Sequence, residues 1–271
     1  MPRNGGATFQ LKICAVSKPF GIRSTPLSMV RFASLVLGSL AAFAPLSFAS
    51  PLVTHELVER QNAKILVNVR IEGSSSTLFE GTVSTQGRDV TTASGGTHRC
   101  DGTNNGQNPV PGPTCTSALA DVSTMAGFWT WDGTWDSNLE DFFVTRIAGT
   151  SQTSSQFWGL LLNWQFTPVG GCQQQIAAGD TVLWAFDAYS KTFFLKLDGP
   201  TTAKVGVPIQ VRVTDGPTDI SISGATIAGY PSSSDNNGYL TVTFTSVGKK
   251  KLKAQRADSL RSNALTVTVT A

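Results

Sequence analysis

The sequence predicts a mainly β protein built from two β-rich segments, the first of which also contains one helix. The chain of 271 residues has 26 Gly and 13 Pro, which indicates many turns and argues against a helical bundle. Stretches in which apolar and polar residues alternate, such as 65–71 and 265–270, recur along the chain. Only residues 118–126 convincingly place apolar side chains at helical spacing.

Residues 1–49 are predicted to be a secretory signal peptide whose true start is Met29. A basic residue soon after Met29, an apolar run over 32–48 and small residues at 47 and 49 are typical of such signals. The run is shorter than the about 20 apolar residues that cross a membrane and contains Pro45, so we expect no membrane anchor. Residues 50–60 are predicted to be a propeptide or linker that ends at Arg60.

The net charge of the chain changes when this leader is removed. The whole sequence has 21 basic and 18 acidic residues, a net charge of +3. Residues 1–60 hold six of the basic and two of the acidic residues, which leaves 15 and 16, a net charge of −1. This balance gives no support to nucleic-acid binding. Residues 61–194 carry −5 and residues 195–271 carry +4, so we expect attraction between the two segments.

The first segment is predicted to start with a β-hairpin over 65–71 and 77–83. A Gly- and Pro-rich loop over 94–114 follows, and its length indicates that it is either cross-linked or functional. The helix comes next, with Thr114 or Thr116 at its start and Gly127 at its end. Strands over 142–147, 156–166 and 181–186 are expected to pair in one sheet. A hairpin, a helix and further strands in this order are typical of the β-grasp fold.

Three cysteines remain after the leader: Cys100, Cys115 and Cys172. In an oxidising compartment they predict one disulfide and one free thiol. Pairing Cys100 with Cys172 or with Cys115 would stabilise the fold by roughly 4 or 3 kcal/mol in the chain-entropy model, which does not distinguish the two. Zinc binding is not expected, because His98 lies only two residues from Cys100 and no Cys-x-x-Cys pair occurs.

Several motifs of the first segment resemble a family of secreted proteins. They are Cys100-Asp-Gly-Thr-Asn104, Pro111-Gly-Pro-Thr114, Asp141-Phe-Phe-Val144, Phe157-Trp-Gly159, Pro168-Val-Gly-Gly-Cys-Gln173 and Gly179-Asp-Thr-Val-Leu-Trp-Ala-Phe-Asp187. Through them, about residues 63–196 resemble the domain of unknown function related to the transcobalamin C-terminal β domain, found in secreted fungal and bacterial proteins.

This resemblance implies a β-grasp-like α+β domain over residues 61–194. It also implies a disulfide between Cys100 and Cys172, with Cys115 left free. The cofactor stays open, and a cobalamin-like tetrapyrrole is the ligand that the resemblance suggests. Vitamin B12 carriers hold the corrinoid between this domain and a large helical barrel, for which this chain has no corresponding segment.

Residues 195–271 resemble bacterial-type immunoglobulin-like domains. The resemblance is carried by residues 199–214, 224–225, 237–244, 248–254 and 261–265. Short strands about every ten residues, separated by Gly, Asp and Asn turns, independently predict an immunoglobulin-like β-sandwich. A basic patch in this segment is expected to lie on a solvated strand and turn; it comprises Lys249, Lys250, Lys251, Lys253, Arg256 and Arg261.

Aromatic residues supply the candidate ligand site. All six Trp lie between residues 129 and 184, and three of them, at 158, 164 and 184, alternate along predicted strands and are expected in the core. The other three lie among turn-forming polar residues, which predicts an exposed hairpin with aromatic faces for a ligand. The predicted site comprises Trp129, Trp131 and Trp135, with Asp101 and Asn104 from the loop 101–105.

These observations predict a secreted, extracellular protein, not an enzyme, that binds a ligand or a surface. No catalytic or metal-binding residue is assigned, because no Gly-x-Ser-x-Gly motif occurs and His98 is the one His of the mature chain. The expected partner is a small ligand, a cell-wall glycan or an extracellular protein. Two alternatives stay open: a carbohydrate-active enzyme using Asp136 or Glu140, and a structural wall or adhesion protein with no small ligand.

Overall fold

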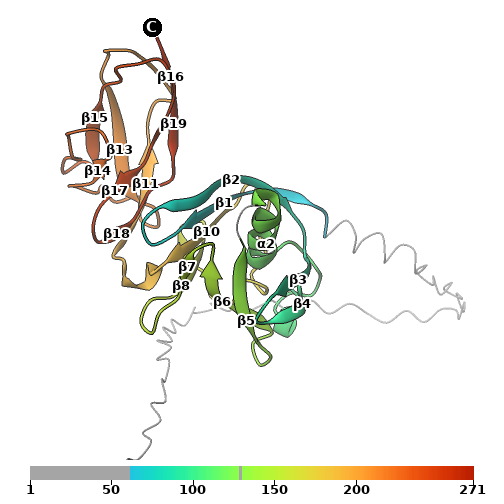
Figure 1. The fold of residues 1–271 in the computed structure, drawn as a ribbon. Coiled ribbons are helices and arrows are strands. Elements are labelled where there is room, and N and C mark those ends of the chain that lie inside the picture. Colours follow the sequence, from blue (N-terminus) through green and yellow to red (C-terminus); the bar gives the residue numbers. More distant parts are fainter. Residues whose placement is uncertain (1–61, 128–129) are drawn as a thin grey trace, which may run out of the picture. The chain divides into compact units, whose positions relative to one another are not determined.

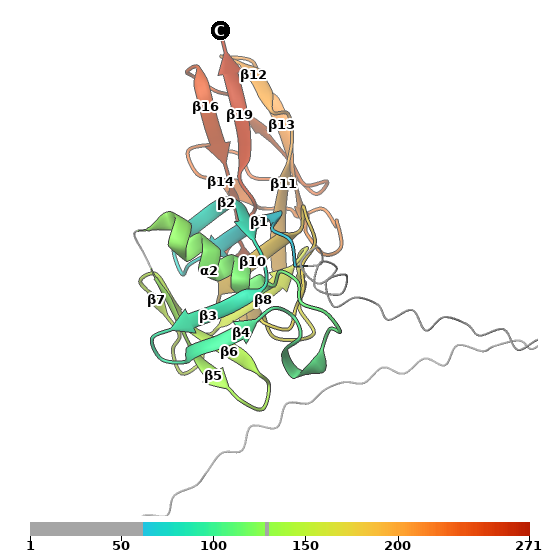
Figure 2. The same ribbon diagram turned by 90° about the vertical axis from the view of Figure 1, so that its right-hand side faces the viewer.

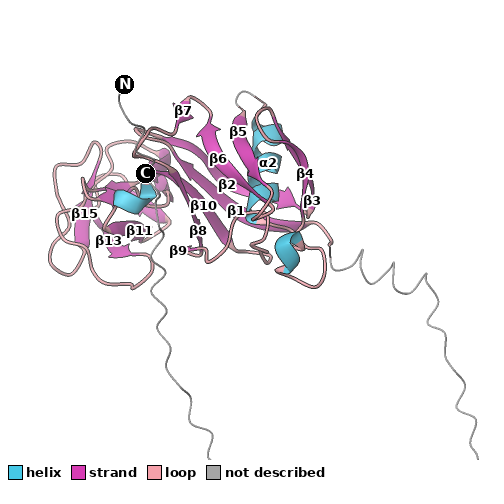
Figure 3. Ribbon diagram, turned by 90° about the horizontal axis from the view of Figure 1, so that it is seen from below, coloured by secondary structure: helices cyan, strands magenta, loops and turns pink. Residues whose placement is uncertain are grey.

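The computed structural model describes residues 62–127 and 130–271. Over these ranges the protein is mainly β, with six sheets and one α-helix (Figures 1 and 3), which confirms the predicted fold class. Within the same ranges, no helix is long and apolar enough to cross a membrane. The predicted signal peptide and the propeptide or linker lie outside the described residues and stay predictions.

A five-stranded sheet contains the predicted first hairpin. Its order is β2 (Thr77–Thr85), β1 (Ile65–Glu72), β10 (Thr181–Phe186), β8 (Trp158–Leu162) and β9 (Gln165–Phe166). Strand β1, the second in this order, runs antiparallel to β2 and parallel to β10, with Asn68 opposite Thr181. Because side chains alternate along a strand, the odd-numbered residues 67–71 face one side of this sheet and the even-numbered residues 66–72 face the other.

Helix α2 (Cys115–Ala126) covers the side to which residues 67, 69 and 71 point (Figures 1 and 2). It starts with a capping box: the Ser117 N–H donates to the Thr114 hydroxyl (3.1 Å), and the Thr114 N–H donates to the Ser117 hydroxyl (2.9 Å). It ends at Gly127, whose φ of 68° lies in the left-handed region. The predicted helix, its Thr114 start and its Gly127 end are confirmed.

Two smaller antiparallel sheets complete the first segment. One pairs β3 (Arg88–Thr92) with β4 (Gly96–Cys100), and the other has the order β5 (Trp131–Asp136), β6 (Asp141–Ile147) and β7 (Thr150–Ser151). The expectation that residues 142–147 pair in one sheet with residues 156–166 and 181–186 is therefore wrong. After β5 the chain turns back within four residues, so β5 takes the backbone hydrogen bonds of β6.

The predicted strand over 156–166 is also interrupted. A two-residue turn at Asn163 and Trp164 separates β8 from β9, with Leu162 opposite Gln165. Trp158 lies in the core as expected, at 5 % exposure, whereas Trp164 is half-buried and Phe166 is exposed. Asn163 and Trp164 have positive φ angles, so the alternation of inward and outward side chains along the strand ends there. The core position predicted for Trp164 depended on that alternation.

The long loop after β3 contains β4 and the 3₁₀ helix η1 (Asn104–Gly106), and it is cross-linked. Cys100, at the end of β4, forms a disulfide with Cys172, and their Cα atoms are 4.4 Å apart. Cys115 is free and buried at the start of α2. The pairing implied by the family resemblance is confirmed.

After the 3₁₀ helix η2 (Ala188–Ser190), residues 193–271 form three sheets. The first sheet has the order β15 (Tyr239–Val242), β13 (Ile209–Asp215), β11 (Phe193–Asp198) and β18 (Ser259–Leu260). The second sheet has the order β12 (Thr202–Lys204), β19 (Leu265–Thr270) and β16 (Gly248–Leu252). The third sheet pairs β14 (Thr226–Ile227) with β17 (Ala254–Gln255). The first two enclose a common core, with Val213 from one and Val267 from the other fully buried. All described residues belong to one compact unit, and the predicted domain boundary at 194/195 stays a prediction.

Replacing both Cys100 and Cys172 with Ala is expected to lower the free energy of unfolding by about 4 kcal/mol, because the disulfide joins residues 72 apart in sequence. Urea unfolding of both proteins measures the difference. Cys115→Ala is the control, since it removes a buried thiol without touching the disulfide. A loss for the double variant no larger than that of the control would contradict this prediction.

Candidate ligand-binding site

The two polar residues of the predicted site hold their own loop together. Asn104 is 2 % exposed, and its amide donates to the carbonyls of Arg99 (2.6 Å) and Glu140 (3.0 Å). The Asp101 carboxylate accepts hydrogen bonds from the N–H (3.0 Å) and the hydroxyl (2.6 Å) of Thr103. Both side chains therefore have internal partners, and ligand binding by them stays a prediction.

The predicted aromatic residues do not form one exposed surface. Trp131 is 7 % exposed and packs edge-to-face on Phe142, with ring centroids 5.8 Å apart. The exposure expected for Trp131 is therefore wrong, because the inner face of the β5–β6 hairpin packs on the core. Trp135 is half-buried and stacks on His98, with centroids 3.9 Å apart. Trp129 lies outside the described residues.

The acidic residues near this hairpin support turns. Asp136 accepts the N–H of Asn138 (2.8 Å), and Glu140 accepts the N–H of Asn105 (2.6 Å). Asp141 is 5 % exposed, and its carboxylate accepts the N–H groups of Phe142 (2.8 Å) and Cys172 (3.0 Å). Burial outweighs these hydrogen bonds and raises the pKa of Asp141 to about 6. This carboxyl group therefore holds the segment that contains Cys172.

Cys115 and His98 are the candidate nucleophile and the candidate imidazole base of the first segment. Burial raises the pKa of the Cys115 thiol, which opposes formation of the reactive thiolate. The His98 ring is engaged by Trp135 and lies 2.9 Å from the Gly95 carbonyl. In the ranges that the structure describes, no group of three or more His, Cys, Asp or Glu side chains is placed to hold a metal ion.

The sheet face opposite α2 carries a buried charged cluster that sequence reasoning missed. Glu72 is 1 % exposed, and its two oxygens accept hydrogen bonds from Lys253 Nζ (2.7 Å) and Arg261 Nε (2.8 Å). Glu80 accepts a second bond from Lys253 Nζ (2.8 Å). We call Arg70, Glu72, Glu80, Lys253 and Arg261 the Glu72 cluster. Its ion pairs join the acidic segment 61–194 to the basic segment 195–271, as their net charges predict. Lys253 and Arg261 are half-buried in these pairs, so the solvated position expected for them is wrong.

Arg70 differs from the other cations of the cluster. It is 2 % exposed, and none of its three guanidinium nitrogens has a hydrogen-bond partner among the described residues. Its closest ionic contact is 3.8 Å, from Nε to an oxygen of Glu72. The ring of Trp164 covers the guanidinium, with the Arg70 Cζ atom 4.6 Å from the ring centroid. This cation–π contact stabilises the charge but gives the five N–H groups no acceptor.

The backbone of the two-residue turn holds Trp164 in this place. Asn163 and Trp164 have φ values of 49° and 71°, as in type I′ hairpin turns. A bulky side chain rarely adopts such a backbone conformation. Gly216 lies against the ring, and a Cβ atom there would come within 2.5 Å of it. The ring is thus held by Arg70, its own turn and Gly216.

A pocket of about 330 Å³ lies beside this ring, and we call it the Trp164 pocket. Strands β1, β2 and β10 contribute residues that are paired across the strands and so share one sheet face. They are Asn68, Arg70, Glu80, Thr82 and Thr181, and Trp164, Lys196 and Asn263 also line the pocket. Lys196 Nζ lies 3.3 Å from Asp219 and 3.6 Å from Asp198.

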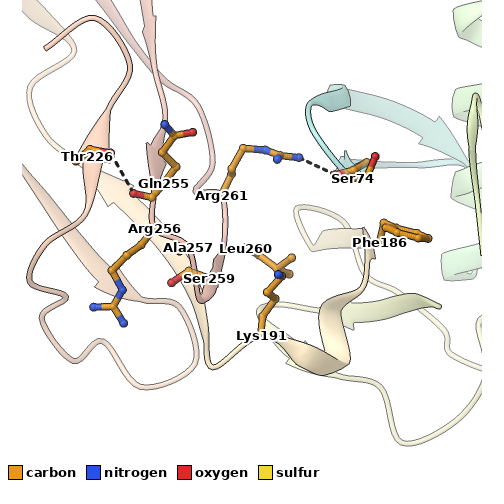
Figure 4. Close-up of a pocket in the computed structure, with 11 residues that line it drawn as sticks. Ser74, Phe186, Lys191, Thr226, Gln255, Arg256, Ala257, Ser259, Leu260 and Arg261 are labelled. Atoms are coloured by element: carbon orange, nitrogen blue, oxygen red, sulfur yellow. Dashed lines mark hydrogen bonds between the residues drawn. The ribbon is translucent and has the colours of Figure 1, made fainter. Parts of the chain in front are cut away.

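A second pocket, of about 390 Å³, has a polar and basic lining (Figure 4). Its cations already have partners: Arg256 pairs with Asp258 (2.7 Å) and Lys191 with Asp187 (3.7 Å). Arg261 reaches toward the turn at residues 73–74, where it donates to the Gly73 carbonyl (2.8 Å). The unpartnered guanidinium favours the Trp164 pocket as the candidate ligand site.

Comparisons with known proteins assign no family to this chain. No protein-family model matches the sequence, and no curated protein matches it. Among solved structures, the chain is similar to haptocorrin in the crystal structure of its complex with Cbi, with a TM-score of 0.31 and 14 % sequence identity. The similarity covers 46 % of this chain and 25 % of that chain, so the match spans a quarter of haptocorrin's length.

Glu72→Gln is expected to lower the free energy of unfolding by about 3–5 kcal/mol, because it leaves Lys253 and Arg261 without the buried carboxylate that they share. Urea unfolding tests this. Asp258→Asn removes the exposed partner of Arg256 and is expected to change stability by less than about 1 kcal/mol. Equal losses in the two variants would contradict a special role for the buried carboxylate.

Asp141 is expected to make the protein less stable as the pH rises from about 4 to about 6. Its folded-state pKa of about 6 exceeds the ordinary value of 3.8, so the folded protein binds its proton more tightly. The stabilisation is complete below pH 4 and is lost as the pH passes 6, with a magnitude on the order of 2–3 kcal/mol. Unfolding of wild type and Asp141→Asn at pH 4 and pH 7 isolates this effect. A difference between the two proteins that is independent of pH would disprove it.

Proposed function

We propose that this chain is a secreted protein without enzymatic activity that binds a small ligand in the Trp164 pocket. The observation that carries the proposal is the held ring of Trp164 beside that pocket. A bulky residue in a left-handed turn is a strained arrangement, and such strain is concentrated at binding and catalytic sites. The half-buried ring also offers a flat apolar contact at the border of the pocket.

The size and composition of the pocket support this role. About 330 Å³ is at the lower end of the volumes that hold small organic ligands. The strand residues Asn68, Thr82 and Thr181 supply polar atoms on a regular sheet face, which is a more rigid support than a loop. An aromatic wall with a few placed polar groups is the usual arrangement of small-molecule sites.

Binding without catalysis is supported by the state of the reactive side chains. Cys115 is buried with a raised thiol pKa, and His98 is stacked on Trp135. The acids Asp136 and Glu140, which the enzymatic alternative would use, accept backbone N–H groups. Secretion is supported by the predicted signal peptide and by the disulfide, since disulfides persist mainly in oxidising compartments.

Trp164→Gly is expected to weaken ligand binding about tenfold or more, because it removes the aromatic wall. The variant creates an Asn-Gly pair at 163–164, which type I′ turns favour, so the hairpin is retained. The measurement is isothermal titration of the full chain with flat aromatic compounds of either charge, corrinoids, haem and cell-wall glycans.

Trp135→Ala is the matched control, because Trp135 is also a half-buried Trp but does not line the Trp164 pocket. The proposal requires that this control binds like wild type. Loss of binding in Trp135→Ala with full binding in Trp164→Gly would move the site to the predicted hairpin and reject the pocket. No binding by any compound would favour the structural alternative.

A further inference from the structure

Arg70 is the one cation of the Glu72 cluster that gains nothing from the cluster's hydrogen bonds. Lys253 and Arg261 donate at 2.7–2.8 Å to the two carboxylates, whereas the nearest Arg70 nitrogen is 3.8 Å from Glu72. A buried guanidinium without acceptors is destabilising, because its N–H groups have lost their water. The cation–π contact with Trp164 and the 3.8 Å ionic contact with Glu72 leave these N–H groups without an acceptor.

The net charge of the Glu72 cluster also indicates that Arg70 lacks an anionic partner of its own. It contains three cations, Arg70, Lys253 and Arg261, and two carboxylates, Glu72 and Glu80. Both carboxylates are occupied, since Glu72 also accepts from Thr77 (3.0 Å) and Glu80 from the Ala264 N–H (2.7 Å). The buried group therefore has one excess positive charge. Lys196 also lines the pocket, but it pairs with the exposed Asp198 and Asp219 and adds no excess positive charge.

We infer that the Trp164 pocket binds a small carboxylic acid with a flat ring, whose carboxylate pairs with the Arg70 guanidinium. This inference rests on the proposed function and names the chemistry of its ligand. A carboxylate matches a guanidinium through two parallel hydrogen bonds, and it supplies both the missing acceptors and the missing negative charge. A flat ring suits the pocket because the aromatic side chain of Trp164 is part of its lining and offers a face on which such a ring can pack.

The ring of Trp164 must move aside for the acid to reach Arg70. It covers the guanidinium at 4.6 Å, and the guanidinium nitrogens are closed to solvent. Rotation of interface side chains on binding is common and leaves the backbone in place. Two charge-assisted hydrogen bonds from Arg70 to the acid then replace the cation–π contact between Arg70 and Trp164. The displaced indole remains available to pack on the ligand's ring.

The first test needs no variant. The full chain is titrated calorimetrically at low ionic strength with 1-naphthoate and with its neutral amide, 1-naphthamide. We expect naphthoate to bind about 10- to 100-fold more tightly, the range that a charge-assisted pair supplies. Equal affinity for the two probes would overturn the acid preference while leaving the Trp164 pocket as a binding site. Absence of binding by both would overturn the inference.

The second test is Arg70→Met, with Arg212→Met as the matched control. Arg212 also lies over an aromatic ring, that of Tyr239 at 5.7 Å, but on β13 and outside the pocket lining. Arg70→Met is expected to lose the preference for naphthoate without a lower unfolding midpoint, because Met removes an unsatisfied buried charge. The control is expected to keep that preference. Retained preference in Arg70→Met, or a fall in its midpoint without loss of binding, would show a structural role and reject the inference.

Arg70→Lys covers the case in which Arg70→Met does not fold. Lysine keeps the charge but cannot form the two parallel hydrogen bonds, so naphthoate affinity should fall about tenfold while naphthamide affinity stays unchanged. Wild-type affinity for naphthoate in this variant would reject the paired geometry. Loss of both probes in Trp164→Gly but not in Arg70→Lys would support the pocket and reject the acid.

Discussion

Burial of the Glu72 carboxylate determines how the outer face of the five-stranded sheet is built. A carboxylate at 1 % exposure is tolerated only when charged donors surround it, because its lost hydration costs several kcal/mol. The donors are Lys253 and Arg261, which lie about 180 residues further along the chain, and the nearby Thr77. One ionised group thus ties the first hairpin to the strands near the C-terminus.

The same requirement decides which cation is left over. Glu72 and Glu80 accept hydrogen bonds from Lys253, Arg261, Thr77 and the Ala264 N–H, so Arg70 obtains only the face of Trp164 and an ionic contact of 3.8 Å with Glu72. The strained turn at Asn163 and Trp164 and the bare backbone of Gly216 both serve to keep that ring in place. An apolar residue at position 70 would make the protein more stable than Arg70 does. Such a loss of stability is expected where a residue is retained for function.

Local signals in the sequence predicted local structure well. The Thr114 cap, the Gly127 end and the first hairpin each depend on a few neighbouring residues, and all three are confirmed. Strand partners depend on the whole chain, so the pairing of β6 with β5 was not predicted. The disulfide was identified through the family resemblance, since loop entropy could not choose between the two pairs.

The Trp164 pocket could not be predicted from the sequence for a related reason. Polar residues at 68, 70 and 72 alternate with apolar ones, which normally indicates a solvated sheet face, and only distant residues reveal that two of them are buried. Trp164 was assigned to a continuing strand. The Asn at position 163, which favours a left-handed turn, was the one local signal against that assignment.

The position of β1 in the sheet has a consequence for how this chain acquires its structure. β1 is an interior strand, and one of its edges pairs in parallel with β10, which is completed only at Phe186. Parallel pairing across so long a separation forms slowly, since much chain entropy is lost before the contacts form. A nascent chain therefore exposes an unpaired apolar strand edge until most of the first segment has emerged, the period in which intermediates of this kind aggregate.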